Sequence, residues 1–493
     1  MKKIVIFLLF GFIVYSKNPN FLFILTDDQA PHTLSCYGNR VLETPNIDSL
    51  AKSGIVLDQA YHMGSMSGAV CSPSRTMIMT GRTLWHLPPR GKKHLLHEVG
   101  ETLNKDILQN TLPAVFNRAG YETFRTCKKG NSYSQANELF QVVRDKTSRK
   151  AGPMDGSQWH GRQILDFLDL RSKKKTKTPF FAFLGFSHPH DERWGRSDLL
   201  KKYGVRNVSE PPSNVGQKAP PVPISWLPKH PFHHGHPNLR DEVRVPGVMT
   251  SRNEATIRNE LGREYACIEN IDEQIGLVLK KLQAMGELEN TYVIYTADHG
   301  IAVGRHGLMG KQNLYEHSWR VPLIVKGPRI KPGSRAPGCV YLLDLLPTFC
   351  ELSGIPIPET VQGKSLKPVL FGKSQKIREV LYGVYCGGTK PGIRAVRKGD
   401  WKLIKYDTMD GEIRQTQLFN LKQNPEELLS YHHSEKIIAK TKNTPTDLQR
   451  NLFGNPAYAE KLQEMENLLL FEMKKYKDPY RLWNQVDDLQ ISF

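Results

Sequence analysis

Four apolar runs along the chain have the pattern of buried β-strands. Asn20–Thr26, Pro179–Ser187 and Thr291–Ala297 are almost continuously apolar, without the polar alternation of a strand that has one face in water. Arg320–Lys326 is a shorter run of the same kind. Apolar residues recur every three or four positions from Ile257 to Leu282, which predicts a long amphipathic helix.

Helical segments alternate with these strands through the first three-quarters of the chain. Pro45–Gly54 and Thr111–Ala119 each have a helical pattern that a glycine closes. This alternation predicts an α/β fold with a large, mostly parallel or mixed sheet sandwiched by helices. Residues 200–250 are rich in Pro and His without a sustained period, so we expect a long surface excursion there.

Beyond about Gly363 the pattern changes to short alternating runs between turn residues, which predicts a short antiparallel sheet. These runs are Leu381–Tyr385, Ile393–Val396, Trp401–Tyr406 and Gln417–Asn420. An amphipathic helix is expected at Tyr458–Met473. We therefore predict a main domain at residues 17–365 and a smaller C-terminal α+β subdomain at residues 366–493.

Residues 1–16 have the pattern of a secretory signal peptide. The basic start Met1–Lys3 precedes an apolar run at Ile4–Tyr15, and Ser16 is suited to cleavage after it. The run is too short for a stable membrane span, although an uncleaved anchor is an alternative. We expect a bacterial protein that is exported to the periplasm or secreted, which argues against nucleic acid as a partner.

The chain is strongly basic, with 68 Lys and Arg against 49 Asp and Glu and a formal net charge of +19. This balance indicates a polyanionic partner, and the alternative is a basic surface without a specific partner. The seven cysteines have no metal-binding spacing, and their odd number leaves at least one thiol without a disulfide.

Polar clusters follow three of the predicted strands. They are Asp27 with Asp28, His188–Asp191, and Asp298 with His299. If the strands are parallel, these ends meet at one edge of the sheet, where open α/β sheets bind ligands. Ionised aspartates are acceptor-only oxygen ligands, so they favour a hard divalent cation, Ca²⁺ or Mg²⁺. Taken singly, each cluster also fits a turn or a packing residue.

The segment Cys71–Arg75 reads CSPSR and carries a proline suited to the first turn of a helix, where free N–H groups attract anions. The alternative is a cysteine in a turn before a core helix. Further cations are Lys128, Lys311 and His190, whose expected ligand is a tetrahedral oxyanion, sulfate or phosphate. A cation site, anion-binding side chains and a thiol-derived group together indicate a hydrolase of anionic esters.

In combination, these motifs resemble the type I, formylglycine-dependent sulfatases of the alkaline-phosphatase-like superfamily. The motifs are CSPSR followed by TGR, the Asp-Asp pair, GYxT leading to a lysine, a PH pair, and ADHG with GLMGKQNLYEHSWRVPLIV. The similarity spans Phe21 to about Gly363 and continues at Leu418–Leu428. It implies a bacterial exported polysaccharide sulfatase whose Cys71 is oxidised to formylglycine by a maturation enzyme acting on the CSPSR motif.

The resemblance also implies a metal site for Ca²⁺, in preference to Mg²⁺. Its ligands would be Asp27, Asp28, Asp298, His299 and the formylglycine made from Cys71. His299 stands where many members of the family have Asn, and both residue types can bind a cation.

By the same resemblance, Arg75 holds the formylglycine side chain, Lys128 and Lys311 contact sulfate oxygens, and His190 protonates the leaving alcohol. In such a reaction one hydroxyl of the hydrated aldehyde attacks sulfur. The second hydroxyl then loses its proton and expels sulfate, which restores the aldehyde.

One position departs from the family pattern. Many members read GKWH after GYxT, and that histidine acts as a base at the nucleophile. Here the segment reads TCKKGN, so Gly130 takes the position of the histidine. Either Asn131 supplies a polar contact, or another histidine such as His306 takes the role of base.

The expected substrate is a sulfated polysaccharide or oligosaccharide, with a galacto-configured sugar as one expectation. Asp191, Arg193 and Arg240 are the candidates for contacts with sugar hydroxyl or sulfate groups. Two other functions stay open. One is a phosphate or phosphonate monoester hydrolase on the same scaffold, and the other is a polyanion-binding protein whose Cys71 is never oxidised.

Overall fold

The computed structural model describes residues 18–88, 105–152, 154–235 and 238–485. The predicted signal peptide at residues 1–16 lies outside these ranges. No helix within them is both long and apolar enough to cross a membrane. All seven cysteines are in the described part of the chain, and all are free.

A nine-stranded mixed sheet forms the centre of the main domain, in the order β10-β2-β9-β7-β1-β6-β4-β5, with β8 paired to β2. Most neighbours are parallel, and β8 and β9 run antiparallel to the strands they pair with. The strands are β1 Asn20–Asp27, β2 Ile55–Tyr61, β4 Glu122–Thr126, β5 Val142–Val143, β6 Phe180–Pro189, β7 Thr291–Ala297, β8 Arg320–Val321, β9 Leu323–Lys326 and β10 Ser334–Tyr341.

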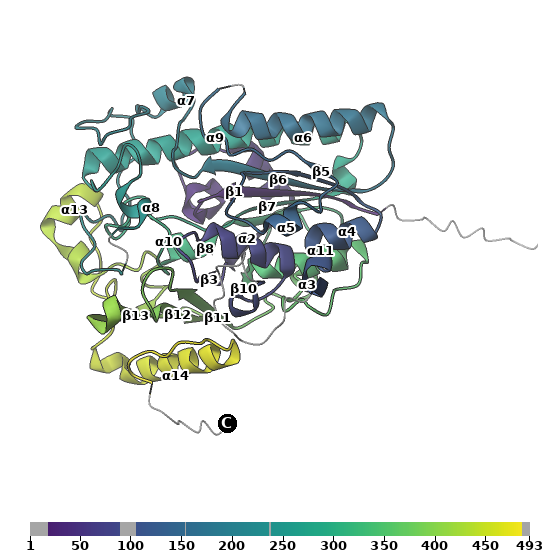
Figure 1. Ribbon diagram of the computed structural model, residues 1–493. Coiled ribbons are helices and arrows are strands. Elements are labelled where there is room, and N and C mark those ends of the chain that lie inside the picture. The colour runs from purple at the N-terminus through teal and green to yellow at the C-terminus, as the bar shows by residue number, and fades with distance from the viewer. Residues whose placement is uncertain (1–17, 89–104, 153, 236–237, 486–493) are drawn as a thin grey trace, which may run out of the picture.

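Helices cover both faces of this sheet, as predicted for an α/β fold (Figure 1). On one face lie α1 Pro45–Ser53, α6 Gly156–Lys173 and α9 Glu254–Ala284. On the other face lie α2 Cys71–Thr80, α4 Leu112–Arg118 and α11 Leu345–Ser353. Every residue of β1 is buried, because the strand lies in the middle of the sheet between the two helical layers.

Strand register brings the polar clusters together. β1 pairs in parallel with β7 up to Thr26 opposite Ala297, and with β6 up to Asp27 opposite Pro189. The residues that follow these three strands therefore lie side by side at the carboxyl edge of the sheet.

The C-terminal part forms a second, five-stranded sheet in the order β14-β13-β12-β11-β3. Its four long strands are antiparallel, and β3, which comes from the main domain, pairs in parallel with β11. The bounds are β3 Gly64–Ser65, β11 Val380–Tyr385, β12 Gly392–Lys398, β13 Trp401–Thr408 and β14 Ile413–Asn420. Helix α14, Ala459–Lys475, covers this sheet (Figure 1).

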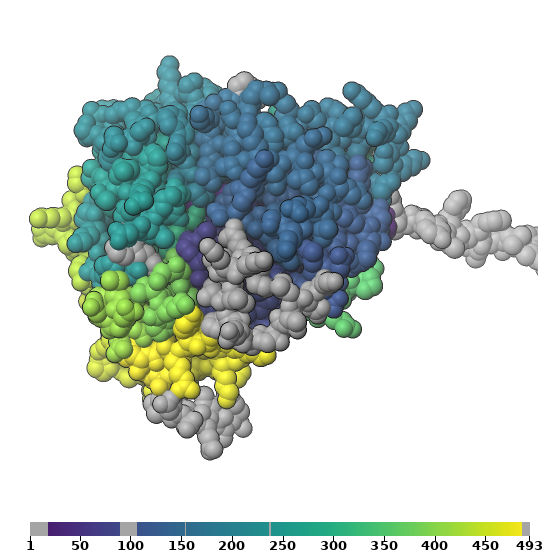
Figure 2. All heavy atoms as spheres, viewed as in Figure 1, coloured from purple at the N-terminus to yellow at the C-terminus, as the bar shows by residue number. Residues whose placement is uncertain are grey.

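The remaining helices are short and lie in the connections. They are α3 Lys105–Gln109, α5 Ser134–Asn137, α7 Ser197–Lys202, α8 Arg240–Val243, α10 Glu316–Trp319, α12 Lys367–Leu370 and α13 Glu435–Thr441. The excursion at residues 200–250 contains α7 and α8, and its apolar side chains form a small core with the start of α9. Figure 2 shows this teal segment forming the surface beside the blue residues of the main domain.

The fold class is confirmed, and several strands differ from the prediction. Arg320–Lys326 is interrupted at Pro322, which lacks the N–H that a continuous ladder needs, so the run forms β8 and β9. The sequence pattern did not indicate β2 or β10. β10 contains Pro337 and Gly338, and its pairing with β2 shifts between Ala336 and Cys339, which obscures the strand period.

Candidate functional site

The site is built around the first residue of α2. Cys71 is fully buried at the start of this helix, and Pro73 occupies the first turn, as its fixed φ allows. No side chain caps the start of the helix, and Gly81 ends it in a left-handed conformation. Ser74 Oγ donates to the backbone oxygen of Asp298 over 2.5 Å, which ties the helix start to the end of β7.

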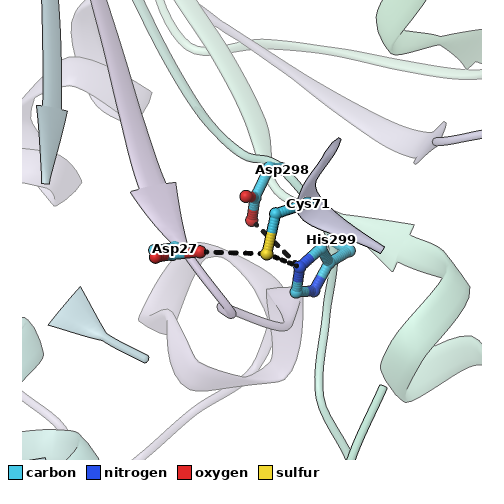
Figure 3. Close-up of side chains that lie close together, drawn as sticks. All are labelled: Asp27, Cys71, Asp298 and His299. Carbon is cyan, nitrogen blue, oxygen red and sulfur yellow. Dashed lines mark hydrogen bonds and ion pairs between the residues drawn. The ribbon is translucent and has the colours of Figure 1, made fainter. Parts of the chain in front are cut away.

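Carboxylates and one imidazole surround the sulfur of Cys71 (Figure 3). Sγ lies 3.5 Å from Asp27 Oδ1 and 3.1 Å from His299 Nε2. His299 Nε2 lies 3.4 Å from Asp298 Oδ1 and 3.2 Å from Asp28 Oδ1. One ligand atom from each of Asp27, Cys71, Asp298 and His299 lies within 4.8 Å of all the others. Because this donor set is rich in acceptor-only oxygens, it fits a hard divalent cation.

The pKa values of Asp27 and Asp28 are lowered, which holds these two carboxylates in their ionised form. Burial acts to raise the pKa of Asp27, but Lys128 and Arg75 hold it well below its usual range. The pKa of Asp28 is also lowered, since His190 and Lys311 outweigh burial. Burial acts to lower the pKa of His299, yet its carboxylate neighbours, above all Asp298, raise it to about 9.

Each carboxylate has its own buried cation. Lys128 Nζ lies 2.5 Å from Asp27 Oδ2 and 3.3 Å from Cys71 Sγ. Lys311 Nζ donates to both oxygens of Asp28 and lies 3.8 Å from the same sulfur. Arg75 Nε donates to Asp298 Oδ2 over 2.8 Å, and its Nη1 contacts the sulfur of Cys127. The sulfur of Cys71 therefore lies among carboxylates and among donors able to bind an oxyanion.

His190 reaches the site from the end of β6. Its Nδ1 lies 2.6 Å from the backbone oxygen of Asp191 and 2.9 Å from the carboxylate of that residue. Because both partners are acceptors, Nδ1 carries a proton and Nε2 is the nitrogen available for chemistry. Nε2 lies 3.8 Å from Asp28 Oδ2, on the side of the acidic cluster.

Three of the candidate substrate contacts have structural partners. Asp191, besides holding His190, accepts two hydrogen bonds from the guanidinium of Arg240, whose side chain is 48% exposed. Arg193 has no exposed surface and pairs with Glu260 on α9. It is therefore placed to support the loop after β6 rather than to contact a substrate.

Neither Asn131, considered for a polar contact, nor His306, considered as the base, has a hydrogen bond to Cys71 in the described part of the chain. His306 is fully buried, stacks on Tyr315 with ring centroids 4.1 Å apart, and contacts the backbone oxygen of Glu426. Asn131 follows Gly130 in the turn after β4, and its side chain has no hydrogen bond to any described residue. Among the described residues, neither side chain contacts Cys71.

Sequence reasoning missed two residues of this region. They are Arg149, which lies 3.7 Å from Asp27, and Cys127, which contacts Arg75. Asp241, which lies 3.6 Å from Lys311, belongs to helix α8 and is the neighbour of the candidate Arg240. Arg149 lies in an irregular segment without a recognisable motif. Cys127 stands one position before Lys128, and that adjacency was the one available signal.

A comparison with protein-family models identifies the chain. Residues 19–355 match the model described as Sulfatase, and this range contains Cys71 and all the side chains that surround it. The chain belongs to the sulfatase family. Residues 304–475 of this sulfatase also match the model described as N-sulphoglucosamine sulphohydrolase, C-terminal, a match that begins in the main domain and extends through the second sheet. As a sulfatase, the protein is an enzyme that hydrolyses sulfate esters.

Individual relatives agree with this assignment. The sulfatase is 26% identical to an N-acetylglucosamine-6-O-sulfatase of Bacteroides thetaiotaomicron, over 94% of this chain and 88% of the relative. It shares its fold with a structure solved in complex with D-glucosamine-2-N,6-O-disulfate, with a TM-score of 0.66, 24% identity and coverage of 94% and 99%. A phosphonate monoester hydrolase from Silicibacter pomeroyi has the same fold, with a TM-score of 0.64, 18% identity and coverage of 93% and 96%.

Proposed function

We propose that this sulfatase removes sulfate groups from sulfated polysaccharides or oligosaccharides through a formylglycine made from Cys71. The single observation that carries the proposal is the buried sulfur of Cys71 between an acidic cluster and two lysines. An unmodified thiol has no exit step for a transferred sulfuryl group. The hydrated aldehyde of formylglycine supplies both a nucleophilic hydroxyl and a second hydroxyl for product release.

Asp27, Asp28, Asp298 and His299 would hold a divalent cation, for which Ca²⁺ fits the oxygen-rich donor set best. Such an ion supplies Lewis-acid polarisation of substrate oxygens. His299 must be neutral to be a ligand, so cation binding at neutral pH releases its proton.

The positively charged side chains would bind the sulfate group. Lys128 and Lys311 approach Cys71 Sγ from Asp27 and Asp28, so each can reach an oxyanion bound at residue 71. Arg75 would orient residue 71 from the next turn of α2 and offset the charge of Asp298. These donors are buried, and charge-assisted hydrogen bonds are strong at buried sites.

His190 would donate a proton to the leaving oxygen. A sugar alkoxide is a poor leaving group, so its departure needs a general acid. Asp191 accepts from Nδ1 and therefore stabilises the protonated ring with its second proton on Nε2, the nitrogen on the side of the cluster.

The substrate class rests on the relatives and on charge. The relatives include enzymes named for N-acetylglucosamine-6-O-sulfate and for ulvan, and the chain carries a net charge of +19. A strongly basic enzyme attracts polyanionic glycans by electrostatic steering. Export to the periplasm or beyond, proposed from residues 1–16, would bring the enzyme to such polymers.

The test compares release of inorganic sulfate from a panel of sulfated saccharides with hydrolysis of matched phosphate and phosphonate monoesters. A phosphonate monoester hydrolase shares the fold, so this is the second candidate function. We expect sulfate esters to turn over faster and Cys71→Ala to abolish the release. A much faster phosphonate or phosphate reaction would favour the second candidate. Absence of any turnover by protein with oxidised Cys71 would favour a binding protein.

A further inference from the structure

Arg149 is the one partly exposed arginine near the cluster whose guanidinium donates no hydrogen bond to a carboxylate, among the described residues. Its Nη2 lies 3.7 Å from Asp27 Oδ2, which is too long for a hydrogen bond. Its Nε is buried and has no hydrogen-bond partner. By contrast, Arg240 is bound by both oxygens of Asp191 and by Asp241.

Asp27 already has a cation that lies nearer than Arg149. Lys128 Nζ already lies 2.5 Å from the same oxygen, and Asp28 and Asp298 are paired with Lys311 and Arg75. A guanidinium has five N–H donors in a rigid fork, and leaving a buried donor without an acceptor costs free energy. The guanidinium of Arg149 can therefore bind an additional anionic ligand without losing a hydrogen bond to the protein.

The backbone holds Arg149 at this position. Residues 144–148 run beside the end of β4, with Lys146 N donating to the backbone oxygen of Cys127 over 2.9 Å. His188 Nε2 lies 3.0 Å from the backbone oxygen of Arg149, and its Nδ1 faces the hydroxyl of Ser157. Because a carbonyl only accepts, Nε2 carries the proton, and His188 acts as a positioning residue for Arg149.

We propose that Arg149 binds an oxygen of the sulfate group being cleaved, as a third cation beside Lys128 and Lys311. The side chain is 23% exposed, whereas Lys128 and Lys311 are 1% and 2% exposed. Arg149 is thus more accessible to a bulky sulfated saccharide than either lysine. A planar guanidinium can bind two oxygens of a tetrahedral oxyanion at once. This inference rests on the proposed function and adds a substrate-binding residue to it.

The test measures binding of inorganic sulfate by titration calorimetry, in a buffer with Ca²⁺, to the full chain carrying Cys71→Ala. This background needs no oxidation of Cys71 and has no turnover. Adding Arg149→Ala should weaken sulfate binding about 10- to 100-fold, the usual effect of losing a charge-assisted hydrogen bond. Arg149→Lys keeps the charge and loses the planar guanidinium. Its affinity for sulfate should therefore fall between that of the Cys71→Ala background and that of the Arg149→Ala variant.

Lys150→Ala is the matched control, because Lys150 is the next residue, is exposed, and carries the same charge. It should change sulfate binding by less than about twofold, since exposed charges are screened. Equal binding by the Arg149→Ala and Lys150→Ala proteins would overturn the inference.

A second arm uses two sulfated monosaccharides, one of which carries a further anionic group. Arg149→Ala could weaken binding of the doubly anionic saccharide only and leave binding of inorganic sulfate unaffected. In that case Arg149 contacts a neighbouring substituent, and the assignment to the cleaved sulfate is wrong. If the Cys71→Ala protein binds no sulfate and the wild-type protein releases none, the proposed function itself fails. Normal binding and turnover that Arg149→Ala leaves unchanged would overturn this inference alone.

Discussion

Replacing His190 with alanine should slow hydrolysis of a sugar sulfate far more than hydrolysis of 4-nitrophenyl sulfate. A sugar alkoxide needs a proton as it leaves, whereas 4-nitrophenolate is stable without one. General acid catalysis contributes about 10²- to 10⁴-fold, so the loss for the sugar sulfate should fall in that range. The aryl substrate should lose less than about tenfold, because it does not depend on this proton.

Asp191→Asn tests the same proton transfer through the residue that contacts His190. The carboxylate lies 2.9 Å from His190 Nδ1 and stabilises the protonated ring. A hydrogen bond to a charged group contributes about 1.5–3 kcal/mol, or roughly 10- to 150-fold in rate. Since the amide oxygen of asparagine can still accept from Nδ1, we expect the lower end of this range, again mainly for the sugar sulfate.

The assay measures kcat/KM for both substrates on preparations whose Cys71 oxidation has been quantified by mass spectrometry. Asp198→Asn is the control, because Asp198 is an exposed partner of Arg196 on the surface. It should leave both substrates unchanged. Equal losses for the two substrates in the His190 variant would refute the role of His190 as general acid and indicate damage to sulfate binding instead.

Three further predictions concern metal and stability. Chelation with EDTA should abolish sulfate release and lower the melting temperature, and added Ca²⁺ should restore both, because a ligand of the native state stabilises it. Lys311→Ala should lower the free energy of unfolding in urea by about 3–5 kcal/mol, since it leaves the buried Asp28 without its cation. Arg394→Ala should lower the free energy of unfolding by a similar amount, because Arg394 and Asp478 form a fully buried ion pair between β12 and the segment after α14. This variant should leave the KM for aryl sulfate unchanged.

Continuous apolar runs made the centre of the fold predictable. β1, β6 and β7 are buried on both faces, so their sequences alone mark them as strands. β2 and β10 lie at one end of the strand order, away from the central β1. Polar residues, a proline and a register shift weaken the hydrophobic period of their sequences. The pairing of β3 with β11 was not predictable, since two residues carry no pattern and their partner is about 320 residues away.

The site was predictable where motifs follow strands, and unpredictable where loops fold back. Parallel register places Asp27 and Asp298 at one edge of the sheet, so strand order was sufficient for them. Arg149 comes from a loop whose course depends on a backbone hydrogen bond to Cys127 and on a hydrogen bond from the side chain of His188 to the carbonyl oxygen of Arg149. His306 was a reasonable candidate by residue type, but the chain turns it into a buried stack with Tyr315.

We expect hydrolysis of sulfate esters to depend on formylglycine at position 71. The direct measurement compares the fraction of Cys71 converted to formylglycine, from peptide mass spectrometry, with the specific activity on one sulfated saccharide across preparations of different conversion. We expect activity proportional to conversion, with none in the Cys71→Ala protein. Activity that is independent of the conversion would contradict this expectation.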